Sequence, residues 1–186
     1  MYVISGENRD VLYIANYRVG STALAGTLMN MGATQVNGHH GLPEGHFDLS
    51  GWLVVQTVRH HCDVIASAWY KNNTHIPFAD YLKTILDGKN PYFHPEGFYN
   101  RYPCNYILRY ETLQFEFDIL CSTAGLPRTE LLVDPSTRPK SLTWQRLFNY
   151  EQTKAVYKMF QHEMDFYGYS MTGNTPERKQ CLDVTS

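Results

Sequence analysis

The sequence predicts a three-layer α/β/α fold with a mostly parallel central sheet. Short apolar runs at residues 11–15, 52–58 and 105–109 have the length and composition of strands that are buried on both faces. Segments with helical periodicity alternate with these strands, which is typical of the α/β class. We expect residues 1–171 to form a single domain and the polar, aperiodic residues 172–186 to form a flexible C-terminal tail.

The first strand leads into a helix. After residues 11–15 the chain turns, and from Ser21 the apolar residues Leu24 and Leu28 recur at helical spacing. Gly32 follows as a helix-stop signal. A strand, a turn that contains glycine and a helix form the opening of a βαβ unit. Residues 34–37 are interpreted as a second strand, which leads into a His-rich loop.

The later elements follow the same alternation. Residues 52–58 are the best candidate for a central strand, and a helix carrying Val64, Ile65, Ala68 and Trp69 on one side should follow. Further helices are predicted over the ranges 78–86, 111–124 and 149–167. The segment 88–103 is rich in Pro, Gly and Asn, and it is predicted to be a long loop.

Composition excludes several classes of partner. The net charge is −2, so no global positive field attracts nucleic acid or a membrane surface. No run of 18 apolar residues and no signal-peptide pattern is present, which predicts a chain without a membrane span or a secretory leader. The four cysteines are widely spaced and form no CxxC pair, which favours reduced thiols and a cytoplasmic location.

The turn at residues 17–22 (YRVGST) has the features of an anion site. It lies between a strand and a helix, where backbone N–H groups and the helix dipole favour negative charge. Gly20 permits close approach of a ligand, and Arg18 adds a fixed charge. The alternative is an ordinary connection with Ser21 as the N-cap. Ala15 and Ser21 replace the first Gly and the Lys of an ATP-binding P-loop, which disfavours a nucleotide kinase.

Arg59 and Ser67 are a second pair of candidates. Arg59 ends the central strand, and Ser67 lies eight residues later in the following helix. Open α/β sheets bind ligands beyond the carboxyl ends of their strands, so this pair and the first turn are expected at the same edge. Alternatively, Arg59 forms a surface ion pair and Ser67 packs between helices.

These motifs resemble those of the sulfotransferases that use 3′-phosphoadenosine 5′-phosphosulfate (PAPS). Residues 17–22 resemble the family's 5′-phosphosulfate loop, and residues 58–67 resemble its 3′-phosphate motif. Three later segments also resemble family features in the same order, namely LRYE at 108–111 with AGLP at 124–127, STRPK at 136–140 and DFYGY at 165–169. The resemblance covers roughly residues 11–170 and implies a P-loop-like sulfotransferase fold.

The resemblance also implies the donor-binding residues. They are Arg18, Val19, Gly20, Ser21 and Thr22 for the 5′-phosphosulfate, and Arg59, Ser67, Arg138 and Lys140 for the 3′-phosphate. The family usually has Pro and Lys where this chain has Tyr17 and Arg18. An arginine keeps the positive charge but changes its reach and geometry.

The loop after the second predicted strand holds the candidate catalytic base. Family members place a His or Glu in this region, and an acceptor hydroxyl needs a base to take its proton. His40 is our first choice, His39 the second and Glu44 the third. The histidines can also be read as exposed loop residues. A metal site built from His39, His40 and His46 with His60 and His61 lacks the spacing of known zinc motifs, so no metal is expected.

The implied reaction is in-line transfer of a sulfuryl group from PAPS to a hydroxyl or amine, with 3′-phosphoadenosine 5′-phosphate (PAP) as the second product. Small-molecule, sugar, lipid and peptide acceptors all remain open. A P-loop phosphotransferase and a non-catalytic nucleotide-binding relative are the alternatives. Aromatic residues either line an acceptor pocket or pack in the core, namely Trp69, Tyr70, Tyr92, Phe93 and Phe98. Tyr110 and Glu111 are interpreted as structural.

Overall fold

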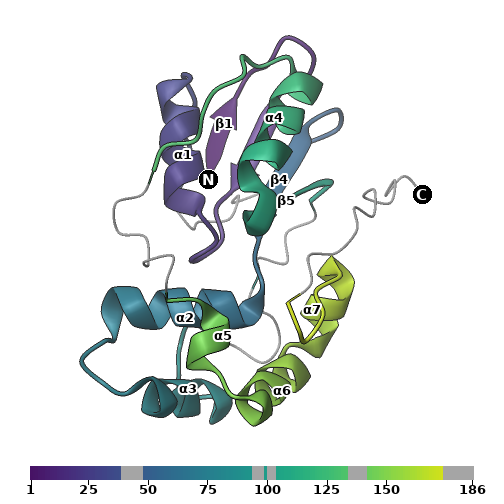
Figure 1. The fold of residues 1–186 in the computed structure, drawn as a ribbon. Helices are drawn as coiled ribbons and strands as arrows, with labels where there is room; N and C mark the ends of the chain where they lie inside the picture. The colour runs from purple at the N-terminus through teal and green to yellow at the C-terminus, as the bar shows by residue number, and fades with distance from the viewer. Residues whose placement is uncertain (39–47, 94–98, 100–103, 134–141, 174–186) are drawn as a thin grey trace. The chain divides into compact units, whose positions relative to one another are not determined.

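A mixed sheet with the strand order β3-β1-β2-β4-β5 organises the computed structural model, which describes residues 1–38, 48–93, 99, 104–133 and 142–173 (Figure 1). The strands are β1 (Tyr2–Ile4), β2 (Val11–Ile14), β3 (Thr34–Gln35), β4 (Leu53–Val58) and β5 (Tyr106–Arg109). The apolar runs predicted as strands correspond to β2, β4 and β5.

The sheet has both parallel and antiparallel pairings. Strand β4 runs parallel to β2 and to β5, whereas β1 runs antiparallel to β2 and to β3. The prediction of a mostly parallel sheet therefore needs correction, because the three residues of β1 were too short a pattern to be recognised. In the parallel part, Ile14 pairs with Gln56 and Val58 pairs with Arg109, so the carboxyl ends of β2, β4 and β5 share one edge.

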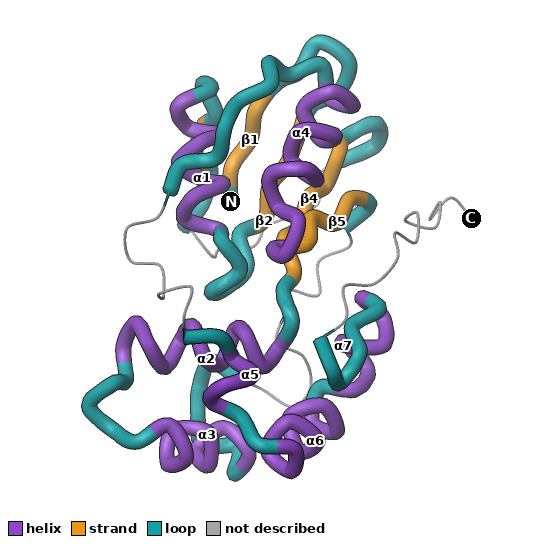
Figure 2. Tube along the Cα trace, in the orientation of Figure 1, coloured by secondary structure: helices purple, strands orange, loops and turns teal. Residues whose placement is uncertain are grey.

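The part of the chain that is described divides into two compact units. The first contains the sheet, helix α1 (Ser21–Asn30), the 3₁₀ helix η1 (Tyr110–Thr112) and helix α4 (Leu113–Ala124). The second contains α2 (His61–Asn72), α3 (Phe78–Leu86), α5 (Trp144–Leu147), α6 (Tyr150–Met159) and α7 (Gln161–Tyr167). Figure 2 shows the strands in the first unit and only helices and loops in the second.

Helices α1 and α4 cover the same face of the sheet. Leu24 and Leu28 of α1 and Phe117 of α4 share one buried cluster with Tyr13 and Val55 of the strands. The opposite face carries a smaller cluster, which consists of Met1, Leu12, Ile14 and Val54 with partly buried neighbours. The first unit is thus an α/β layer pair, and its described residues do not show the predicted third layer.

The second unit is built around buried aromatic residues. Phe160 is 2% exposed and stacks on the ring of His61, with 4.7 Å between the ring centroids. The helix predicted over 149–167 is in fact two helices. Phe160 has φ −111° and ψ 21°, outside helical geometry, and it separates α6 from α7. Within the described residues, no helix is both long and apolar enough to cross a membrane.

Candidate functional site

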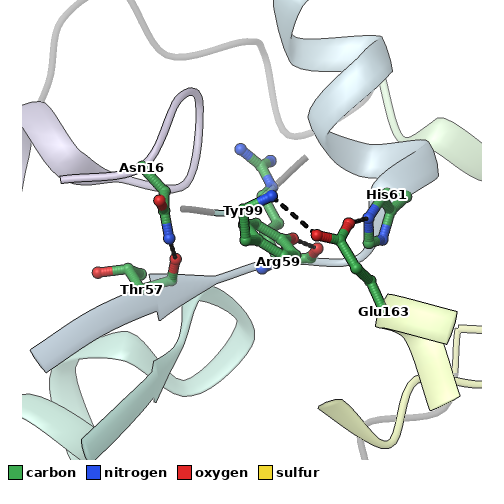
Figure 3. A network of polar contacts seen from close by, with 6 residues as sticks. All are labelled: Asn16, Thr57, Arg59, His61, Tyr99 and Glu163. Atoms are coloured by element: carbon green, nitrogen blue, oxygen red, sulfur yellow. Dashed lines mark hydrogen bonds and ion pairs between the residues drawn. The ribbon is translucent and has the colours of Figure 1, made fainter. Parts of the chain in front are cut away.

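The chain that leaves β2 is attached to β4 by a buried asparagine. The Nδ2 of Asn16 donates to the carbonyl of Thr57 at 3.0 Å (Figure 3). The same group donates to Oε1 of Gln56 at 3.3 Å. Asn16 is 2% exposed, and Gln56 and Thr57 are fully buried. The start of the turn at residues 17–20 is therefore held against the carboxyl end of the neighbouring strand.

Two residues of this turn have backbone conformations that are uncommon for L-amino acids. Gly20 has φ +81° and Arg18 has φ +59°, and Arg18 is a non-glycine residue with positive φ in the described chain. Positive φ costs free energy at a residue with a side chain, and such strain concentrates at functional positions. Val19, between them, is fully buried and anchors the turn in the core.

The Tyr110 ring and the Leu113 side chain pack directly against Gly20. A Cβ at Gly20 would lie 2.9 Å from Cδ2 of Tyr110 and 3.0 Å from Cδ2 of Leu113. Tyr110 belongs to η1, so the LRYE segment that the sequence singled out supports the turn. The packing of Tyr110 on Gly20 agrees with the interpretation of Tyr110 as a structural residue.

The N-terminus of α1 follows Gly20 and carries no acidic side chain to offset its positive end. Gly20 is the N-cap and gives no side-chain capping bond, and the first turn contains no acidic residue. The first N–H groups of a helix have no intrahelical partner, and such an end favours negative charge. Ser21 is buried and Thr22 is exposed. Residues 18–22 thus form the turn and the start of α1, and their role in donor binding remains a prediction.

In the second unit, Arg59 is buried and held by its own neighbours. Its Nε donates to Oδ2 of Asp63 at 2.7 Å, and Nη2 lies 2.6 Å from the same oxygen. The Tyr99 hydroxyl accepts from the Arg59 N–H at 2.8 Å and donates to the Arg59 carbonyl. Both the backbone and the guanidinium group of Arg59 are therefore fixed in this structure.

Ser67 lies on the same side of α2 as Asp63. The two residues are four positions apart in the helix, which places them on one face. Ser67 is 4% exposed. Ser67 therefore lies one helical turn beyond the carboxylate that contacts Arg59.

Two buried histidines follow Arg59. Nε2 of His61 lies 2.8 Å from Oε2 of Glu163, and the His60 ring stacks on Trp144 with 4.6 Å between centroids. Burial lowers the pKa of both histidines below the ordinary value, and it outweighs the opposite effect of the Glu163 hydrogen bond on the pKa of His61. Because a carboxylate can only accept, Nε2 of His61 donates to Glu163.

Several predicted residues lie outside the described part of the chain. They are the base candidates His39, His40 and Glu44, the loop residue His46, the basic residues Arg138 and Lys140, and the aromatic residue Phe98. Their roles remain predictions. Of the other candidate aromatic residues, Phe93 is buried and Tyr92 is 64% exposed.

Sequence reasoning missed Asn16, Tyr99 and Glu163. A polar residue immediately after an apolar strand is a weak signal that could have indicated Asn16. Tyr99 and Glu163 reach their partners from 40 and 102 residues away along the chain, and no local pattern reports such contacts. Among the residues that the structure describes, no group of three or more His, Cys, Asp or Glu side chains could hold a metal ion.

Solved structures with a similar fold include a sulfotransferase. The crystal structure of mouse sulfotransferase SULT7A1 complexed with PAP aligns with 87% of this chain and 85% of that chain, at 12% identity and a TM-score of 0.46. No protein-family model and no curated protein matches the sequence. A likeness of this size assigns neither a family nor a function to the chain.

Proposed function

We propose that this chain is a sulfotransferase that moves a sulfuryl group from PAPS to a hydroxyl or amine acceptor by in-line displacement. The observation that carries the proposal is the turn between β2 and α1. Gly20 is the N-cap of α1, and the first turn of α1 contains no acidic residue. Arg18 lies in the same turn and has positive φ. Such an anion site could serve several reactions. The sequence motifs that resemble sulfotransferase motifs, and that occur in the same order along the chain, favour sulfuryl transfer.

The 5′-phosphosulfate end of the donor is assigned to residues 18–22. Backbone N–H groups at the start of α1 and the Arg18 guanidinium would stabilise the charge that develops on the departing phosphate oxygen. Gly20 has positive φ, and the Tyr110 side chain occupies the space that a Cβ would need. Substitution of the usual lysine by Arg18 keeps the charge and adds a planar donor fork.

The 3′-phosphate end is assigned to Arg59 and Ser67, with Arg138 and Lys140 as additional cations. Arg59 is the residue that follows the last residue of β4, and β4 is the parallel neighbour of β2. Binding energy at this end would hold the donor in the geometry for attack.

The acceptor needs a general base, and we assign this role to His40, with His39 and Glu44 as alternatives. As the acceptor oxygen or nitrogen bonds to sulfur, the bond from sulfur to the phosphate oxygen breaks. The acceptor proton passes to the base, and PAP leaves with the electron pair of the broken bond. No metal ion is part of this scheme.

Ligand binding tests the proposal. We expect isothermal titration calorimetry to show that adenosine 3′,5′-bisphosphate binds at least tenfold more tightly than adenosine 5′-monophosphate, and more tightly than ATP with Mg²⁺. The 3′-phosphate should contribute about 1.5–3 kcal/mol through charge-assisted hydrogen bonds. A screen of hydroxyl and amine acceptors with sulfur-labelled PAPS then tests transfer.

Each outcome separates the candidate functions. Preference for ATP with Mg²⁺ would identify a phosphotransferase and contradict sulfuryl transfer. Tight binding of the bisphosphate without transfer to any acceptor class would indicate a nucleotide-binding protein without catalytic activity. The variant Arg18→Gln tests the contribution of the Arg18 charge, because glutamine retains most of the side-chain length but is neutral.

A further inference from the structure

One phenol satisfies both backbone groups of Arg59. The residue lies between β4 and α2 and belongs to neither element, so its N–H and C=O need partners outside regular structure. The hydroxyl of Tyr99 provides both partners, accepting from the N–H at 2.8 Å and donating to the carbonyl. Tyr99 is 3% exposed, so water does not easily replace these bonds.

Tyr99 is in turn held by α7 (Figure 3). Its N–H donates to Oε1 of Glu163 at 3.0 Å, and the other carboxylate oxygen of Glu163 accepts from Nε2 of His61 at 2.8 Å. The Tyr99 ring also packs edge-on against His61 and Tyr167, with centroid distances of 5.1 and 5.2 Å. One carboxylate therefore connects the tyrosine that holds residue 59 with the first residue of α2.

The side chain of Arg59 has a partner of its own, Asp63. Asp63 receives two N–H groups of the guanidinium on a single oxygen, within the first turn of α2. This interaction directs the guanidinium but does not determine where its Cα lies. The position of the Cα depends on the backbone, whose N–H and C=O groups are both bonded to the Tyr99 hydroxyl.

We propose that Tyr99 and Glu163 are positioning residues for Arg59, so that this arginine is preorganised to bind a phosphate. The inference rests on the proposed function only in assigning the 3′-phosphate of the donor to Arg59. Glu163 fixes Tyr99, Tyr99 fixes the peptide groups of residue 59, and the guanidinium is thereby presented without a loss of conformational freedom on binding.

The test compares two ligands that differ only in the 3′-phosphate. Tyr99→Phe removes the hydroxyl and keeps the ring and its packing. We expect this variant to bind adenosine 3′,5′-bisphosphate about tenfold more weakly than the wild type, because buried N–H and C=O groups of residue 59 lose their partner. Its affinity for adenosine 5′-monophosphate should stay within about twofold of the wild-type value.

The Glu163 variants provide a second line. Glu163→Gln keeps an oxygen that can accept from the Tyr99 N–H, so it should largely retain the preference for the bisphosphate. Glu163→Ala removes the acceptor and should lose that preference by a factor similar to Tyr99→Phe. Tyr150→Phe is the matched control, since Tyr150 is 62% exposed on α6, and it should bind both ligands as the wild type does.

Two results would overturn the inference, and they are distinguishable. If the wild type prefers the bisphosphate but Tyr99→Phe weakens both ligands equally, or neither, Tyr99 is a purely structural residue. If the wild type itself shows no preference for the bisphosphate, the phosphate role of Arg59 fails together with the proposed function. Circular dichroism melts identify any variant that does not fold. If either Tyr99→Phe or Glu163→Ala does not fold, the binding data of the other variant test the inference.

Discussion

At the scale of single residues, the turn after β2 depends on backbone conformations that its side chains do not favour. Gly20 adopts a left-handed conformation with Tyr110 and Leu113 in contact, so the position excludes a side chain by both its conformation and its space. Arg18 adopts a similar conformation despite its side chain. Strained backbone of this kind concentrates at functional positions.

Gly20→Ala should therefore destabilise the protein more than alanine at a glycine that has positive φ but free space around its Cα. We expect a loss of about 2 kcal/mol or more, from positive φ together with overlap with Tyr110 and Leu113. The matched control is Gly32→Ala. Gly32 also has positive φ (+99°), but a Cβ there would meet no atom within 4 Å, so the loss should be about 1 kcal/mol. Urea denaturation measures both, and equal losses would contradict the packing argument.

At the scale of elements, β2 and β4 are joined by buried polar side chains as well as by their ladder. The Tyr13 hydroxyl and Oγ1 of Thr57 lie 3.1 Å apart, and Asn16 extends the connection beyond the end of β2. Polar groups at a buried position require such partners, since an unsatisfied one costs free energy. The connection sets where the turn begins relative to the strand that leads to Arg59.

Asn16→Ala removes the amide donor to the Thr57 carbonyl. We expect it to lower the free energy of unfolding by about 1–3 kcal/mol, because that carbonyl is buried. Asn16→Asp should be at least as destabilising, since it places an acceptor where a donor is needed. Asn30→Ala, on the exposed end of α1, is the control and should change stability by less than about 0.5 kcal/mol. Chemical denaturation with indistinguishable midpoints for Asn16→Ala and the wild type would exclude this role for Asn16.

At the scale of the whole molecule, the buried histidines of the second unit link folding to pH. Burial lowers the pKa of His60 and of His61 in the folded chain. Between that lowered value and the unfolded value of about 6.5, the unfolded chain binds protons that the folded chain does not. Glu163 favours the charged form of His61, the Ser170 carbonyl and Asp63 favour that of His60, and His61 disfavours protonation of His60.

The free energy of unfolding should consequently fall as pH drops below about 6.5 and should gain nothing further from these groups above it. Each unit of pKa depression corresponds to about 1.4 kcal/mol of stability lost at low pH. Urea titrations at a series of pH values measure this slope. His61→Gln can still donate to Glu163 but does not titrate, so its stability should depend less steeply on pH than that of the wild type. An equal slope in both proteins would show that His61 does not contribute.

Local patterns were sufficient for the parts of the fold and site that depend on neighbours in sequence. The buried strands β2, β4 and β5 follow from short apolar runs, and the turn at residues 17–22 follows from its place between a strand and a helix. The same is true of α1, which begins at Ser21 as expected. Strand and helix periodicity are properties of a few consecutive residues, so the sequence expresses them directly.

The features that only the tertiary structure decided depend on contacts between distant residues. Strand β1 is too short to be recognised until it pairs with β2, and the break between α6 and α7 lies at Phe160, whose ring packs on His61. The contacts of Tyr99 with Arg59 and Glu163 span 40 and 64 residues. Such pairings are fixed by burial and by the need of each buried polar group for a partner, and neither leaves a periodic trace in the sequence.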